Sequence, residues 1–270
     1  MVTCYNLRAH REGADPVIDH LINQIPTPII FAHRGASRYA PENTLSAFQL
    51  AFEQGARAIE LDVKLSKDEE VVVFHDLKLD RTTNGKGLLK NFTFDELNQL
   101  DAGSYFHQKF CNEKIPTLSQ VLDLVDGKYL INIELTNYST LGDELISKVV
   151  VNVKKKSVQH SIIFSSFSSG NIIKIKHAFP EVPAALLTPP GFIGIIMQSD
   201  LYRRISPEFI HINIQSVKKG LIDREHRRHR RVNVWTVNEE SHMQYLVSAG
   251  ADGFFTDDPP LALQVIGKNQ

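Results

Sequence analysis

The sequence predicts an α/β fold built as a (β/α)8 barrel, and three observations lead to this class. Short runs rich in β-branched residues alternate with longer amphipathic stretches, which is typical of parallel strands joined by helices. Two neighbouring runs lie too close together for a parallel crossover, so one of them falls outside the ring. The length of 270 residues suits one TIM barrel. On periodicity alone, a doubly wound open sheet fits as well.

The strand candidates number nine, one more than the barrel needs. They cover residues 28–32, 58–63, 71–74, 129–135, 161–165, 184–187, 209–212, 232–237 and 253–256. Only residues 64–70 separate the second and third runs, so these two runs are predicted to form an antiparallel hairpin. Helices are expected between the strands, at residues 44–54, 118–125, 141–155, 168–177, 217–229 and 239–249.

Residues 77–115 interrupt this alternation. They contain a Thr-Asn-Gly turn at residues 83–85 and a short helix opened by the capping box Thr93-x-x-Glu96. We interpret them as a small insertion after the second strand's hairpin that lies over the active-site mouth. No linker divides the rest of the chain, so residues 1–270 are expected to form a single domain. The insertion also holds three aromatic side chains, Tyr105, Phe106 and Phe110.

Positive and negative charges nearly balance, because 30 Lys and Arg face 31 Asp and Glu, for a formal net charge of -1. A chain without a strong positive field is not drawn to nucleic acid or to anionic lipid, so we expect neither as a partner. The arginine-rich run 224–231 is interpreted as the solvated face of an outer helix.

Cys4 and Cys111 are the two cysteines, too few to staple a chain of this length, and both are expected to be reduced thiols. The first 28 residues contain no apolar core of a signal peptide. No apolar run approaches the roughly 20 residues of a membrane-spanning helix. We therefore expect a cytoplasmic protein without a transmembrane segment. The sequence does not indicate an oligomeric state.

Polar side chains gather where three predicted strands end, which in a barrel is the edge that builds the active site. His33 and Arg34 follow the first strand, Glu60 and Asp62 end the second, and Glu134 ends the next parallel strand. Glu60 and Asp62 share one face of their strand because they are two residues apart. Three converging carboxylates would repel one another unless a divalent cation lay between them, and oxygen ligands favour Mg²⁺ or Ca²⁺ over zinc.

The hairpin brings a second histidine to the first. Folding residues 71–76 back along the second strand is expected to place His75 level with Asp62. His33 and His75 can then act as general acid and general base, while the planar fork of Arg34 suits a phosphate oxygen. A base, an acid, a cation and a guanidinium together predict hydrolysis or internal transfer at a phosphodiester.

From end to end the chain resembles the glycerophosphodiester phosphodiesterase family. The residues that carry the resemblance are His33-Arg34-Gly35, Pro41-Glu42-Asn43-Thr44, Glu60-Leu61-Asp62-Val63, His75-Asp76, Asn132-Ile133-Glu134, Trp235-Thr236-Val237-Asn238, Asp252-Gly253 and Thr256-Asp257. The resemblance implies a TIM barrel that hydrolyses glycerophosphodiesters to glycerol 3-phosphate and an alcohol. It also implies metal ligands at Glu60, Asp62 and Glu134, acid and base at His33 and His75, and a cyclic phosphate intermediate.

One position departs from the family pattern, which commonly has Lys two residues after the third metal-ligand Glu. This chain has Thr136 there. A threonine hydroxyl can bind a phosphate oxygen but supplies no charge, so Thr136 and Arg34 are the predicted phosphate-binding residues. Trp235, near the end of its strand, is predicted to line the substrate pocket on the glycerol side.

Other polar positions have structural interpretations. Asn43 either caps the following helix or orients His33. Asp258 is expected to cap a helix that begins with Pro259, without a catalytic role. His211 lies within an apolar strand and is expected to be a buried interior histidine.

Three alternatives remain open. The substrate is a lysophospholipid if the aromatic side chains of residues 77–115 form an apolar entrance, as in lysophospholipase D enzymes. A catalytically silent phosphate-binding module would explain Thr136. A glycosidase with Glu60 and Glu134 as its carboxylate pair would leave His33 and His75 without a role. In the leading hypothesis the partner is a small glycerophosphodiester molecule.

Overall fold

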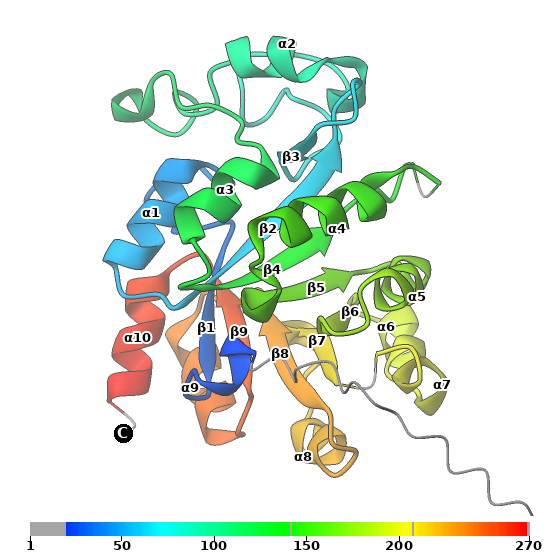
Figure 1. Ribbon diagram of the computed structural model, residues 1–270. Coiled ribbons are helices and arrows are strands. Elements are labelled where there is room, and N and C mark those ends of the chain that lie inside the picture. The colour runs from blue at the N-terminus through cyan, green and yellow to red at the C-terminus, as the bar shows by residue number, and fades with distance from the viewer. Residues whose placement is uncertain (1–19, 141, 207, 269–270) are drawn as a thin grey trace, which may run out of the picture.

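Parallel strands close into a barrel in the computed structural model, which describes residues 20–140, 142–206 and 208–268 (Figure 1). The ring consists of β1 (Ile29–His33), β2 (Ala58–Leu65), β4 (Leu130–Leu135), β5 (Ile162–Ser166), β6 (Ala184–Thr188), β7 (Phe209–Asn213), β8 (Arg231–Trp235) and β9 (Gly253–Thr256). β1 pairs with β2 on one side and with β9 on the other, and these pairings close the ring. The predicted eight-stranded barrel is confirmed and the open sheet is wrong.

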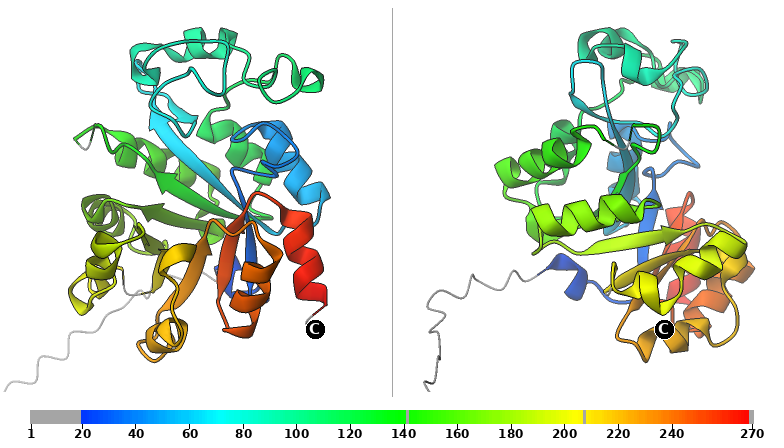
Figure 2. Two further views of the ribbon diagram at one scale, coloured as in Figure 1. Left: turned by 180° about the vertical axis from the view of Figure 1, so that it is seen from behind. Right: turned by 90° about the vertical axis from the view of Figure 1, so that its right-hand side faces the viewer.

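Helices surround the ring on the outside, as the three views show (Figures 1 and 2). The α-helices are α1 (Leu45–Glu53), α2 (Phe94–Gln99), α3 (Leu118–Val125), α4 (Leu145–Lys156), α5 (Ser169–Ala178), α6 (Phe192–Met197), α7 (Asp200–Arg203), α8 (Leu221–His226), α9 (Glu240–Ser248) and α10 (Pro259–Gly267). Short 3-10 turns are η1 (Leu21–Asn23), η2 (Leu89–Asn91), η3 (Gln108–Phe110), η4 (Gln159–Ser161) and η5 (Ile214–Ser216). Thr44 and Asp258 cap α1 and α10 through their side chains, as predicted for Asp258.

The predicted helices differ from the observed ones in two places. The stretch 217–229 forms only the short helix α8, because Gly220 adopts a left-handed conformation immediately before it. The helix expected from residue 141 begins at Leu145, and Leu141 itself lies outside the described residues. The sequence did not predict α6 and α7, which fill the connection between β6 and β7.

The expected hairpin is present. β3 (Val71–Val73) runs antiparallel to the end of β2, with Val63 opposite Val73. Residues 77–115 follow β3 and extend away from the ring on that side (Figure 1). Thr93 and Glu96 form the predicted capping box at the start of α2. The insertion has a small core of its own, made of Val72, Phe74, Leu79, Leu89, Leu97, Ala102 and Ile115.

Apolar and polar layers fill the interior of the ring. Phe31, Phe209 and Phe255 belong to the apolar cluster inside it, and Phe31 stacks on Phe255. His211 is fully buried, its Nε2 accepts a hydrogen bond from the side-chain amide of Asn233, and burial lowers its pKa to about 3. The prediction of an interior histidine is therefore confirmed.

The arginine-rich run 224–231 is not a uniformly solvated face. Arg230 is 1% exposed and its Nη1 lies 3.4 Å from Oε2 of Glu225, which is fully buried. Arg224 and Arg228 also pair with Glu225. The interpretation as a solvated face is therefore wrong for Arg230, which immediately precedes β8. Its Nε donates a hydrogen bond to the carbonyl of Phe209. Because these arginines pair with Glu225, the run presents fewer unpaired positive side chains than the sequence suggests.

Cys111 is a free, exposed thiol, whereas Cys4 lies outside the described residues, as does most of the segment inspected for a signal peptide. Within the part of the chain that the structure describes, no helix has the length and apolar character needed to cross a membrane. The compartment stays a prediction.

The buried Arg230–Glu225 pair gives a stability prediction. Glu225→Gln leaves Arg230 buried without its counter-charge, so we expect the free energy of unfolding to fall by about 3 kcal/mol. Glu208→Gln, which removes an exposed pair with Lys176, is the matched control and should cost less than about 1 kcal/mol. Urea denaturation of both variants measures the difference, and equal losses would contradict the burial argument.

Candidate active site

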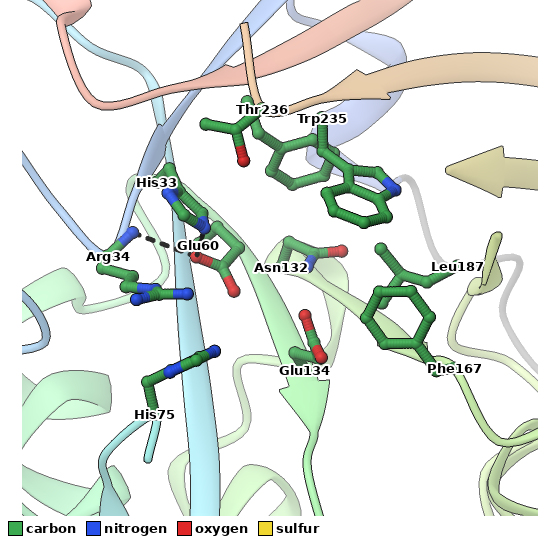
Figure 3. A pocket seen from close by; sticks show the side chains of 11 residues that line it. His33, Arg34, Glu60, His75, Asn132, Glu134, Phe167, Leu187, Trp235 and Thr236 are labelled. Atoms are coloured by element: carbon green, nitrogen blue, oxygen red, sulfur yellow. Dashed lines mark hydrogen bonds and ion pairs between the residues drawn. The ribbon is translucent and has the colours of Figure 1, made fainter. Parts of the chain in front are cut away.

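The register of three neighbouring strands builds the site. His33 of β1 lies opposite Glu60 of β2, and Asp62 lies opposite Glu134 of β4. These side chains open into a pocket with about 480 Å³ of empty space, part of it open to solvent. Figure 3 shows the polar groups on one side of this site pocket and the apolar side chains on the other. Its lining residues are His33, Arg34, Glu60, His75, Asn132, Glu134, Phe167, Leu187, Trp235, Thr236 and Phe255.

Glu60, Asp62 and Glu134 form a compact carboxylate cluster. One oxygen from each lies within 4.8 Å of the others; Glu60 and Asp62 are buried and Glu134 is partly exposed. Burial and the neighbouring charge of Asp62 raise the pKa of Glu60 well above its usual range and that of Glu134 to about 8. Such a set of oxygen ligands fits a hard divalent cation, because the cation would relieve the repulsion that raises both pKa values.

Arg34 connects the cluster to the pocket. Its backbone adopts a left-handed conformation and its N–H donates to Oε2 of Glu60 at 3.0 Å. The guanidinium donates from Nη1 to Glu42 at 2.8 Å and lies 3.3 Å from Asp62 through Nε. Asn43 donates from its side-chain amide to Asp62 at 2.9 Å, so it orients Asp62 rather than His33. Burial favours a protonated Asp62, but Arg34 holds its pKa below the usual value.

His33 is oriented by a carboxylate from the far end of the chain. Its Nδ1 lies 2.6 Å from Oδ1 of Asp257, which also accepts from Ser37 and, through Oδ2, from Asn238. Despite burial, the hydrogen bond from His33 holds the pKa of Asp257 at about 2, so the carboxylate is ionised and Nδ1 carries the hydrogen. Nε2 then faces the cluster, 4.0 Å from Glu60.

His75 has a similar partner. Its Nδ1 lies 2.6 Å from Oδ1 of Asp76, and Arg81 donates to both oxygens of Asp76, at 2.7 and 2.9 Å. The hydrogen bonds from Arg81 hold the pKa of Asp76 far below its usual value. The predicted register was wrong by one residue, because Phe74, not His75, donates its N–H to the carbonyl of Asp62. His75 still lines the pocket.

Thr136 makes its hydrogen bonds to neighbouring residues of the protein. Its hydroxyl donates to the carbonyl of Val63 at 2.8 Å and accepts from Nζ of Lys64 at 2.7 Å. Thr136 is 3% exposed and does not line the site pocket. The hydroxyl hydrogen of Thr136 is therefore already donated within the protein. The positively charged group beside it is the ammonium of Lys64.

Trp235 lines the apolar side of the site pocket, where it packs edge-to-face against Phe167 with ring centroids 5.3 Å apart. Tyr105, Phe106 and Phe110 instead pack on one another, and none of them lines this pocket. The OH of Tyr105 accepts from the N–H of Glu42. The apolar entrance expected from these three rings is absent from the pocket lining.

Sequence reasoning gave no role at the site to four polar residues, although two of them stand in the motifs of the family resemblance: Lys64, Asp76, Tyr138 and Asp257. Lys64 follows Asp62 by two residues, as Asp62 follows Glu60, so the alternation of a strand already placed all three side chains on one face. Asp76 is the neighbour of His75 in the chain. Tyr138 donates its OH to Glu134 at 2.8 Å. Asp257 lies 224 residues from His33, and only the closure of β1 on β9 brings the two together.

Fold and site together define an α/β-barrel phosphodiesterase, and comparison with known proteins agrees. Residues 33–261 match the glycerophosphoryl diester phosphodiesterase family. The chain is 36% identical over 250 residues to the glycerophosphodiester phosphodiesterase of Caldanaerobacter subterraneus subsp. tengcongensis, covering 89% of this chain and 98% of that protein. A Bacillus altitudinis glycerophosphodiester phosphodiesterase is 36% identical over 241 residues, with coverage of 87% and 97%.

A solved structure is also similar. The structure of an Oleispira antarctica phosphodiesterase in complex with the product sn-glycerol-3-phosphate matches with a TM-score of 0.80 and 32% identity. The match covers 89% of this chain and 97% of that chain. This protein therefore belongs to the glycerophosphoryl diester phosphodiesterase family.

The raised carboxyl pKa values predict a pH-dependent cation effect. Without cation, folded Glu134 keeps its proton up to about pH 8, whereas the unfolded residue loses it near 4.5, so stability falls as pH rises through this interval. A cation bound by the ionised cluster opposes that loss. A free cation concentration of about 100 times the Kd adds about 2.7 kcal/mol to the free energy of unfolding. We therefore expect Mg²⁺ or Ca²⁺ to raise Tm more at pH 8 than at pH 6.

Thermal unfolding with EDTA, with each divalent ion and with NaCl at matched ionic strength measures this effect. Equal Tm shifts at both pH values, or the same shift with NaCl, would exclude proton-coupled binding at the cluster.

Proposed function

We propose that this protein hydrolyses glycerophosphodiesters to glycerol 3-phosphate and an alcohol, with one divalent cation, Mg²⁺ or Ca²⁺, as cofactor. The supporting observation is that Glu60, Asp62 and Glu134 lie within 4.8 Å of one another where His33 and His75 share a pocket. The product complex of the Oleispira antarctica phosphodiesterase supports the same product. The partner is a small molecule.

The three carboxylates would hold the cation, which when bound supplies positive charge to neutralise the phosphate. Arg34 lines the same pocket and keeps donors beyond those used by Glu42 and Asp62, so it binds a phosphate oxygen. Burial opposes the charge of this arginine, but the neighbouring carboxylates keep it protonated, and the low local dielectric strengthens each hydrogen bond that it makes to the substrate.

The two histidines move the protons. The substrate's neighbouring glycerol hydroxyl attacks phosphorus, one imidazole takes the hydroxyl proton, and the other gives a proton to the departing alcohol. The new O–P bond closes a cyclic phosphate and the bond to the alcohol breaks. Water then opens the ring with the proton transfers reversed. Asp257 and Asp76 hold the Nδ1 hydrogens, so both Nε2 atoms are free for this exchange.

The apolar side of the site pocket receives the glycerol moiety. Trp235, Phe167 and Leu187 form a wall that contacts the glycerol carbons and excludes water from one face of the substrate. A lysophospholipid has weaker support, because the aromatic side chains of the insertion that were expected to admit its chain do not line the site pocket.

A substrate panel tests the proposal. We expect wild-type protein to release glycerol 3-phosphate from glycerophosphocholine, to lose this activity in EDTA and to regain it with Mg²⁺ or Ca²⁺. His33→Ala and His75→Ala should each lower kcat by at least about 100-fold. Lysophosphatidylcholine is the parallel substrate. Turnover of that lipid alone would favour a lysophospholipase D, and tight binding without product would favour a silent phosphate-binding module.

The carboxylate partner of His33 gives a separate prediction. Asp257→Asn removes the charge that holds the imidazole, so we expect kcat to fall about 10- to 100-fold with little change in KM. Asp252→Asn is the matched control, since Asp252 makes the same kind of pair, at 2.7 Å, with His226 away from the site pocket. Comparable losses in both variants would show that the effect is structural.

A further inference from the structure

The site pocket continues into two further hollows that lead toward the insertion. The middle hollow shares His75, Glu134 and Phe167 with the site pocket. The outer hollow shares Lys64, Leu77, Thr136 and Ser139 with the middle one. The shared lining residues place the three hollows next to one another, along a path that leads from the carboxylate cluster toward the insertion.

Lys64 stands where the middle and outer hollows meet. Its side chain is directed to the same face of β2 as Glu60 and Asp62, and the residue is only 8% exposed. Nζ donates to the carbonyl of Thr136 at 3.0 Å and to its hydroxyl at 2.7 Å. The third ammonium hydrogen has no hydrogen-bond acceptor among residues 20–140, 142–206 and 208–268. A fixed cation therefore has a donor to offer to a group in the hollows.

The lining of the outer hollow is apolar and cationic. Leucines from the insertion and from the end of β2 form the apolar part of the wall, at Leu65, Leu77, Leu88 and Leu89, beside neutral polar residues of the segment 136–140. Lys90 adds a second ammonium group, and neither Asp nor Glu is part of this lining. In the middle hollow, the carboxylate of Asp76 is already paired with Arg81 and His75. The outer hollow is therefore lined by two positive charges, those of Lys64 and Lys90, with no carboxylate in its lining to balance them.

We propose that the outer hollow is a binding subsite for the alcohol part of the substrate, and that it prefers alcohols bearing a phosphate or carboxylate group. This inference rests on the proposed function and names the substrate class of the same site. Lys64 and Lys90 bind the anion, while the leucines contact the carbon chain between that anion and the scissile phosphate.

The size of the site pocket determines which arm of the substrate follows this path. The site pocket ends against Trp235, Phe167 and Leu187 and must already hold the phosphate and the glycerol common to all substrates. The alcohol, which varies between substrates, extends from the same phosphorus toward the hollows. A quaternary ammonium is the least suitable alcohol, because it would meet two lysines and no aromatic ring in the outer lining.

Four glycerophosphodiesters that differ in the charge of the alcohol test this subsite. The alcohols are glycerol, glycerol phosphate, glycerate and choline. We expect KM to be lowest for the two anionic alcohols, intermediate for glycerol and highest for choline, with a spread of about tenfold that shrinks as NaCl is raised. Equal KM values for all four would overturn the subsite and leave the proposed function standing. Hydrolysis of none of them would overturn both.

Charge variants locate the effect. Lys90→Gln should raise KM for the phosphate- and carboxylate-bearing substrates about threefold and lower KM for the choline diester, because one of the two repelling ammonium groups is removed. Lys86→Gln is the matched control, because Lys86 is an exposed lysine of the same insertion that does not line the outer hollow. Lys64→Gln should abolish the remaining preference while lowering kcat/KM for every substrate. Identical effects of Lys90→Gln and Lys86→Gln would overturn the proposal by showing a general surface field instead of a subsite.

Discussion

Burial of three carboxylates side by side is the constraint on which the site depends. Glu60, Asp62 and Glu134 are held together by strand register, and burial, together with the charge of Asp62, raises the pKa values of Glu60 and Glu134. The nearby residues oppose this repulsion. Arg34 supplies charge, and the amide of Asn43 and the hydroxyl of Tyr138 supply hydrogen bonds. A divalent cation bound by the three carboxylates would complete the compensation.

The positive charge that the family pattern places two residues after Glu134 comes from a different strand in this protein. The position two residues after Glu134 holds Thr136, while Lys64 extends from β2 to bond with that threonine. Thr136 therefore anchors a cation supplied by the neighbouring strand. Each histidine also has a carboxylate at Nδ1. Asp76 is the neighbour of His75 in the chain, whereas Asp257, the partner of His33, lies near the opposite end of the chain.

Local patterns in the sequence were sufficient for the ring, the hairpin and the carboxylate cluster, because alternation and short spacing determine which residues share a face. They were not sufficient where partners are distant in the chain or where tertiary packing decides. Asp257 meets His33 only after β9 closes on β1. Arg230 looked solvated in an arginine-rich run, yet Glu225 draws it into the interior. The sequence did not predict α6, because six residues are too few to show a helical period.

The separate core of the insertion divides the molecule into two parts that can change independently in evolution. Leu79, Leu89 and Leu97 belong to this separate cluster, whereas His33, Glu60 and Glu134 project from strands of the ring. Replacement of surface residues between β3 and α3 would leave the geometry of the carboxylates intact. Relatives that share this ring can therefore diverge in the molecules they accept by altering one exchangeable segment, while the reaction itself is conserved.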